Sequence, residues 1–202
     1  MQSAPTERTI AAPSTPDLST LAGAQQDMRS GYMDGGAGVL VSGLVWAVAG
    51  GVAAWVAPER AVWALFVGGM FIHPLAVLLV KLLGGPGRHT DGNPLGPLAM
   101  ATTFWMIMLL PLAYGVSLLR LELFFPAMML VIGGRYLCFH TLYGNRLYWV
   151  MGAVLGVAGY AMGVANASVA LSAFTGAAIE IGCAGLLLAR CRRQGAPHSV
   201  AA

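Results

Sequence analysis

A glutamate near the end of the chain is the first residue whose type and spacing could do chemistry. Ser168, Ser172, Gly176 and Glu180 follow one another at intervals of four inside an apolar stretch, so a helix would place the carboxyl on a small, polar face. A carboxylate in an apolar layer is costly, and such residues usually face a bundle interior or a watery cavity. Glu180 is therefore a candidate proton-binding group. A protonated or paired glutamate with only a structural role is the alternative.

Two other ionisable side chains lie in similar stretches. Arg135 cannot shed its proton, so it must pair with a partner or reach a headgroup layer. His73 precedes Pro74, which removes a helix hydrogen bond and predicts a kink. Counted along their helices at ~1.5 Å per residue, the three Cα atoms fall within roughly 3 Å of one another in depth. This predicts a polar cluster of His73, Arg135 and Glu180; a buried ion pair without a transport role is the alternative.

Motifs for enzyme chemistry are missing from the sequence. It contains no HExxH, GxSxG or CxxC pattern and no carboxylate dyad. The 3 cysteines, Cys138, Cys183 and Cys191, are too few and too irregularly spaced for a disulfide framework or a zinc site. Segment 84–96 is rich in glycine and carries Arg88 and His89, but it lacks the GxxxxGK[ST] phosphate pattern. We therefore predict no enzyme activity, no metal and no cofactor.

The elements that must position these residues follow from composition. Of 202 residues, 57% are hydrophobic and only 9% are charged, against roughly a quarter charged in soluble domains. The net charge is +3 and the basic residues flank apolar runs, which indicates membrane topology and not nucleic-acid binding. The chain therefore needs a lipid bilayer as its partner. The excess of arginine over the single lysine, Lys81, together with many alanines and glycines, is typical of a GC-rich bacterial genome.

Six apolar segments follow a polar start, each near the ~20 residues that span ~30 Å of hydrocarbon. Because lipid satisfies no backbone group, these segments must be helices. The predicted fold is an all-α polytopic bundle of six transmembrane helices within residues 35–190. The expected spans are 35–57, 61–83, 97–119, 121–142, 147–165 and 168–190.

Two tails complete the predicted organisation. Residues 1–34 form an N-terminal tail in which a helix starting near Thr15-Pro16 could lie on the membrane surface, and 191–202 form a basic C-terminal tail. With the N-terminus in the cytoplasm, eight basic residues lie on that side and two, Arg60 and Arg120, on the other. This asymmetry predicts a multi-pass protein of the bacterial inner membrane with both termini cytoplasmic.

Small residues indicate how the helices pack. Gly152, Gly156, Gly159 and Gly163 form one stripe along the fifth span. Such stripes let helix backbones approach closely, which drives association in lipid. Packing within the chain is the favoured interpretation, and a homo-oligomer face is the alternative.

Several short segments resemble a group of small bacterial membrane proteins that is known only as a domain of unknown function. The resemblance covers about residues 32–165. It rests on FIHPL at 71–75, GNPL at 92–95, TFWM at 103–106, LPLAYG at 110–115, FFPAM at 124–128 and IGGRY at 132–136. It implies a multi-pass membrane protein and supplies no activity, ligand or catalytic residue.

Three classes of function remain, and the third, an intramembrane enzyme, is the least favoured because no reactive pair is visible. The first is a transporter or channel for a proton or a small polar solute, with the predicted cluster lining its route. The second is a non-catalytic structural, stress or regulatory membrane component. An aqueous cavity that reaches the charged residues would favour the first class, and a dry, closely packed bundle would favour the second.

Overall fold

A computed structural model describes residues 16–195, and this part of the chain is helical. Six candidate membrane spans are long and apolar enough to cross a bilayer, so the predicted all-α, six-span bundle is confirmed. The helices are α1 (Leu21–Tyr32), α2 (Gly36–Trp55), α3 (Pro58–Leu82), α4 (Gly96–Leu119), α5 (Phe124–Tyr143), α6 (Leu147–Val164) and α7 (Val169–Gly195). Two short 3-10 turns, η1 (Met33–Gly35) and η2 (Leu121–Leu123), precede α2 and α5.

Proline and residues with positive φ mark the helix boundaries. Pro58 is at the start of α3, because a first-turn proline loses no helix hydrogen bond; this lengthens the span beyond the predicted start at 61. Gly144 ends α5 with φ of 62°, and Asn166 follows α6 with φ of 50°. α7 continues past the predicted end at 190 to Gly195 and carries basic residues in its last turn, where they complement the helix dipole.

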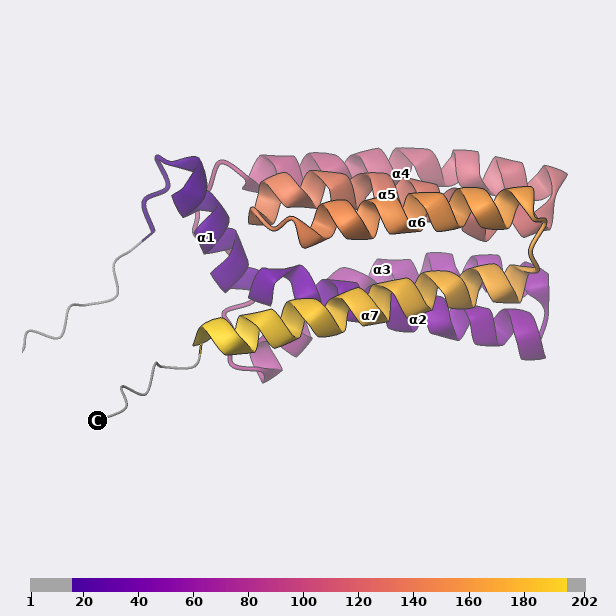
Figure 1. The fold of residues 1–202 in the computed structure, drawn as a ribbon, viewed down its shortest axis with the longest axis horizontal. Coiled ribbons are helices and arrows are strands. Elements are labelled where there is room, and N and C mark those ends of the chain that lie inside the picture. The colour runs from indigo at the N-terminus through magenta and orange to yellow at the C-terminus, as the bar shows by residue number, and fades with distance from the viewer. Residues whose placement is uncertain (1–15, 196–202) are drawn as a thin grey trace, which may run out of the picture.

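The six spans divide into two groups of three, which lie as separate layers in Figure 1. The first half consists of α2, α3 and α7, and the second half consists of α4, α5 and α6. Within the first half, the first and last spans of the chain pack along each other. The C-terminal part of α7 lies at the same end of the bundle as α1, and we call this the α1 end.

Glycines allow the closest helix contacts, although not every glycine of the predicted stripe takes part. A Cβ added at Gly152 would lie 2.6 Å from the Gly133 carbonyl oxygen, and one at Gly159 would lie 2.8 Å from the Pro126 carbonyl oxygen. Both positions therefore bring α6 close to α5. At Gly156 the added Cβ would meet nothing within 4 Å, so the side-chain position of this residue is open and does not face the contact.

A helix is present within the predicted N-terminal tail. α1 starts after Thr20, whose hydroxyl accepts a hydrogen bond from the Gly23 amide at 3.1 Å; the expected cap at Thr15 lies outside the described residues. α1 ends where Met33, Asp34 and Gly35 all have positive φ, and this turn lets the chain enter α2 at a steep angle. α1 therefore crosses the end of the bundle (Figure 1). Residues 1–15 and 196–202, which include most of the predicted C-terminal tail, lie outside the described part.

Candidate functional site

Glu180 lies midway along the closely packed interface between α7 and α2, which we call the Glu180 seam. The small residues of α7 let α2 approach: an added Cβ at Gly176 would lie 2.5 Å from the Trp46 ring, and one at Gly43 would lie 3.1 Å from the Glu180 Cβ. Glu180 itself is fully buried. The small, polar face predicted around Glu180 is thus the face that packs against α2.

The carboxyl of Glu180 is bonded through one oxygen only. The Tyr136 hydroxyl, from α5, donates to its Oε1 at 2.9 Å. The buried Ser42 hydroxyl of α2 lies beside the same carboxyl, and Oε2 makes no hydrogen bond of good geometry among the described residues. Because Tyr136 belongs to the second half and Glu180 to the first, this bond joins the two halves. A buried carboxyl oxygen without a partner is rare in native structures and calls for an explanation.

Two further polar atoms in this seam are buried without a partner in the described part of the chain. They are the indole nitrogen of Trp46 and the hydroxyl oxygen of Ser172. Ser172, Gly176 and Glu180 are one turn apart on α7, and Trp46 packs against Gly176. The seam therefore contains an indole N–H donor, a hydroxyl and a carboxyl at successive levels. Within this set the carboxyl can bind a proton, whereas the indole N–H can only donate a hydrogen bond and accepts no proton.

Arg135 faces a different neighbour. Its Nη2 donates to the Thr103 hydroxyl at 2.9 Å and its Nη1 to the Met106 sulfur at 3.4 Å, both on α4. Its guanidinium carbon lies 5.0 Å from the centre of the Phe139 ring. The Nε atom is buried and has no partner among the described residues. Arg135 thus occupies the seam between α4 and α5.

His73 lies on an exposed face of α3, and none of the side-chain hydrogen bonds found in residues 16–195 involves it. The structure therefore does not join the three residues of the predicted cluster by hydrogen bonds. It places Glu180 against Tyr136, Arg135 against α4, and His73 on the outer surface of the bundle. The reason is rotational: successive residues of a helix point about 100° apart, so Tyr136 faces α7 while Arg135 faces α4.

Sequence reasoning missed Tyr136, although one signal was available. A tyrosine in the middle of an apolar span must find a partner for its hydroxyl, and the only carboxyl within an apolar span away from the helix ends is Glu180. Tyr148, at the start of α6, is also buried, and its hydroxyl donates to the Asp34 carbonyl oxygen at 2.7 Å.

A second contact between the halves lies at the α1 end. The Asn145 side chain, between α5 and α6, donates to Asp34 Oδ2 at 3.1 Å, and Tyr148 bonds the same residue's backbone. Tyr148 also lies beside Tyr136, with ring centres 6.0 Å apart. Polar contacts between the halves therefore occur both at Glu180 and at the start of α2.

α1 is held to the bundle by a buried carboxyl, Asp27, which precedes the first span predicted at 35–57. Asp27 accepts hydrogen bonds from the Thr90 amide at 2.9 Å, the Thr90 hydroxyl at 2.6 Å and the Asn93 side chain at 2.7 Å. Burial alone would raise the pKa of the Asp27 carboxyl, but these bonds outweigh burial and hold that pKa below its usual value. Asp27 therefore fastens α1 to the connection between α3 and α4.

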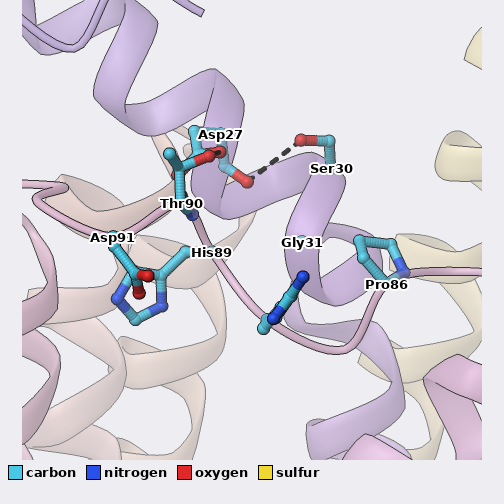
Figure 2. A pocket seen from close by; sticks show the side chains of 8 residues that line it. Asp27, Ser30, Gly31, Pro86, His89, Thr90 and Asp91 are labelled. Atoms are coloured by element: carbon cyan, nitrogen blue, oxygen red, sulfur yellow. Dashed lines mark hydrogen bonds between the residues drawn. The ribbon is translucent and has the colours of Figure 1, made fainter.

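A polar pocket of about 360 Å³ lies between α1 and this connection. Figure 2 shows Asp27, Ser30, His89, Thr90 and Asp91 around it, with the Ser30 hydroxyl bonded to the Asp27 backbone. Another pocket of about 410 Å³, lined by Glu59, Trp63 and Tyr114 among others, lies at the opposite end of the bundle. Neither pocket is lined by a residue of the predicted cluster. Within residues 16–195, no group of His, Cys, Asp or Glu is placed to hold a metal ion.

The comparisons with known proteins add a family and no activity. A model described as a family of unknown function (DUF7010) matches residues 21–190. This match is wider than the expected resemblance over 32–165, and it includes α7 and Glu180. The comparison with curated proteins and the comparison with solved structures each found no match.

Proposed function

The chain belongs to the DUF7010 family of unknown function, and we propose that it is a small transporter in which Glu180 binds and releases a proton. The proposal rests on one observation: a fully buried carboxyl that joins the two halves through one oxygen and leaves the other without a partner. Ionisable groups at membrane depth are costly, and they are retained where they serve proton relays or solute pathways.

A change in proton occupancy at Glu180 would alter the bond between the halves. The ionised carboxyl only accepts hydrogen bonds, whereas the protonated form also donates one. Each form therefore favours its own arrangement of the Tyr136 and Ser42 hydroxyls around Glu180. Because Tyr136 lies in the opposite half, protonation can shift the equilibrium between two positions of the halves. This coupling is what a proton-driven transporter of a small polar solute needs.

The proposed setting is the bacterial inner membrane, with both termini in the cytoplasm. The basic-residue asymmetry supports this orientation. The position of α1 and the last turns of α7 at one end of the bundle agrees with it (Figure 1). A homo-oligomer stays a prediction.

One observation favours the alternative, a non-catalytic structural or regulatory component. Large side chains fill the interior near the Glu180 seam: Trp46, Phe125, Tyr136 and Tyr148 are all buried. Neither of the two described pockets reaches Glu180, which supports the closely packed bundle expected for that class. A transporter would have to open a path by moving the halves apart.

Proton flux into proteoliposomes distinguishes the two functions. A pH-sensitive dye inside the liposomes would report proton flux driven by a potassium diffusion potential. The measurement would be made without solute and then with each member of a panel of small carboxylates, amino acids and sugars. We expect flux in the wild type and its loss in Glu180→Gln, which has the same shape but no titratable proton. Glu59→Gln is the matched control, because Glu59 is exposed. Wild-type flux equal to that of empty liposomes in every arm favours the structural component. Full flux in Glu180→Gln overturns the role of Glu180 as the proton-binding group.

A further inference from the structure

Arg135 has more hydrogen-bond donors than the protein uses. A guanidinium carries five N–H groups. Here one contacts the Thr103 hydroxyl at 2.9 Å and one contacts the Met106 sulfur at 3.4 Å, which is a weak acceptor. The buried Nε has no partner in the described part of the chain. The hydrogen-bonding capacity of this side chain is therefore largely unfilled.

No negative charge offsets this arginine within hydrogen-bond distance. Its charge is permanent, and its bonds within the described residues go to neutral groups. Glu180 is bonded to Tyr136 instead and acts on Arg135 only at longer range. A full charge in the membrane without a directly bonded counter-ion costs at least ~2.5–3.5 kcal/mol.

The guanidinium does not escape this cost by reaching toward the α1 end. Arg135 lies eight residues before the end of α5 at Tyr143, so its Cα is ~12 Å from that end. Its partners Thr103 and Met106 lie seven and ten residues into α4, at depths of ~10 Å and ~15 Å. The side chain therefore stays at the depth of its own backbone and does not extend to the headgroups.

The surroundings fix the orientation of the guanidinium. The Thr103 hydroxyl donates to the Ala99 carbonyl oxygen at 3.0 Å, so its lone pairs remain free to accept from Arg135. The Phe139 ring packs against the guanidinium at 5.0 Å. A held guanidinium with unused N–H groups matches the two oxygens of a carboxylate or phosphate group.

We propose that Arg135 binds an oxyanion, a carboxylate or phosphate group, in the seam between α4 and α5. The inference rests on the proposed function and names its substrate class: a small anion carried together with the proton of Glu180. A lipid phosphate that enters the seam to the depth of Arg135 presents the same chemistry and is the other source of the oxyanion. Either ligand would complete the hydrogen bonds and neutralise the charge.

Thermal unfolding of the purified full chain in neutral detergent tests the site. The melting temperature would be followed by tryptophan fluorescence with acetate, inorganic phosphate or phosphatidylglycerol, against chloride at equal ionic strength. At a ligand concentration one hundred times Kd we expect an increase of about 5–10 °C. The increase in melting temperature should vanish in Arg135→Gln. It should shrink in Arg135→Lys, which keeps the positive charge but loses the planar guanidinium that can bind two oxygens at once. Arg146→Gln is the control, because Arg146 is exposed in the loop before α6.

The arms of the experiment separate the possible results. An increase with acetate or phosphate identifies a solute site, and an increase with phosphatidylglycerol alone assigns the oxyanion to a lipid. The site is overturned if none of the three probes raises the melting temperature. It is also overturned if Arg135→Gln and Arg135→Lys show the same increase as the wild type. Glu180→Gln should keep the increase. If proton flux fails while the Arg135-dependent increase persists, the transport proposal is wrong and the oxyanion site stands; the reverse result removes the site alone.

Discussion

Two glycines one turn apart on α6 should respond oppositely to the same substitution. An added Cβ at Gly152 would lie 2.6 Å from the Gly133 carbonyl oxygen and 2.8 Å from the Leu137 Cδ2 atom, whereas one at Gly156 would meet nothing within 4 Å. A carbon–oxygen contact normally lies near ~3.3 Å. Gly152→Ala must therefore separate α5 and α6 by roughly 0.7 Å, while Gly156→Ala requires no movement.

The expected energies follow from these distances. Overpacking of this kind costs about 1–3 kcal/mol, and a gap of ~0.5–1 Å loses a quarter to a half of the dispersion energy along the seam. Gly156→Ala should instead stabilise the protein by ~0.4–1 kcal/mol, because alanine restricts the unfolded chain. The two variants should differ by about 1.4–4 kcal/mol. At ~2–4 °C per kcal/mol, this gives a difference of roughly 3–16 °C in Tm.

Tryptophan fluorescence during heating in detergent measures this difference directly. Gly159→Ala serves as a second test, because its Cβ would lie 2.8 Å from the Pro126 carbonyl oxygen; it should melt below the wild type as Gly152→Ala does. A Gly152→Ala protein that melts at or above the wild type would refute the reasoning. So would a Gly156→Ala protein that falls as far as Gly152→Ala, because the seam would then lie elsewhere on α6.

Tyr136→Phe removes the donor to Glu180 and should destabilise the protein by about 1–3 kcal/mol, measured as a lower Tm; an unchanged Tm contradicts the bond. Asp27→Asn should loosen α1, seen as faster hydrogen exchange of its amides, since one acceptor oxygen is lost. The pKa of Asp27 is lowered in the folded protein. The bonds of Asp27 therefore stabilise α1 fully at a pH above the usual carboxyl pKa, and this stabilisation is lost as the pH falls through the lowered pKa. Asp27→Asn should lack this pH dependence. An alkaline phosphatase fused to Ala202 should be inactive and a fluorescent cytosolic reporter active; the opposite pattern refutes the cytoplasmic C-terminus.

The six spans were predictable because each is a long apolar run, and hydrocarbon leaves the backbone no alternative to a helix. The polar face of Glu180 was predictable for a similar reason, since a spacing of four residues keeps side chains on one side of a helix. Both inferences use information contained within one segment of the chain.

The neighbours of each face were not predictable from such local information. Arg135 and Tyr136 have nearly equal depth, but a difference of about 100° in direction decides which of them meets Glu180. The same limit applies to the glycine stripe, where Gly152 meets α5 and Gly156 does not. Depth follows from counting residues along the chain, whereas direction depends on how all six helices pack together.

The contacts of α1 have a consequence for the order of assembly during synthesis. Asp27 is held by Thr90 and Asn93. Both of these residues are made only after α2 and α3. The carbonyl groups that accept from Gln25 and Arg29 belong to Thr141 and Tyr143, at the end of α5. α1 is thus among the first segments to leave the ribosome and cannot complete its contacts until four spans have followed it. Until then its polar residues face water, and its docking marks the point at which the second half has begun to assemble against the first.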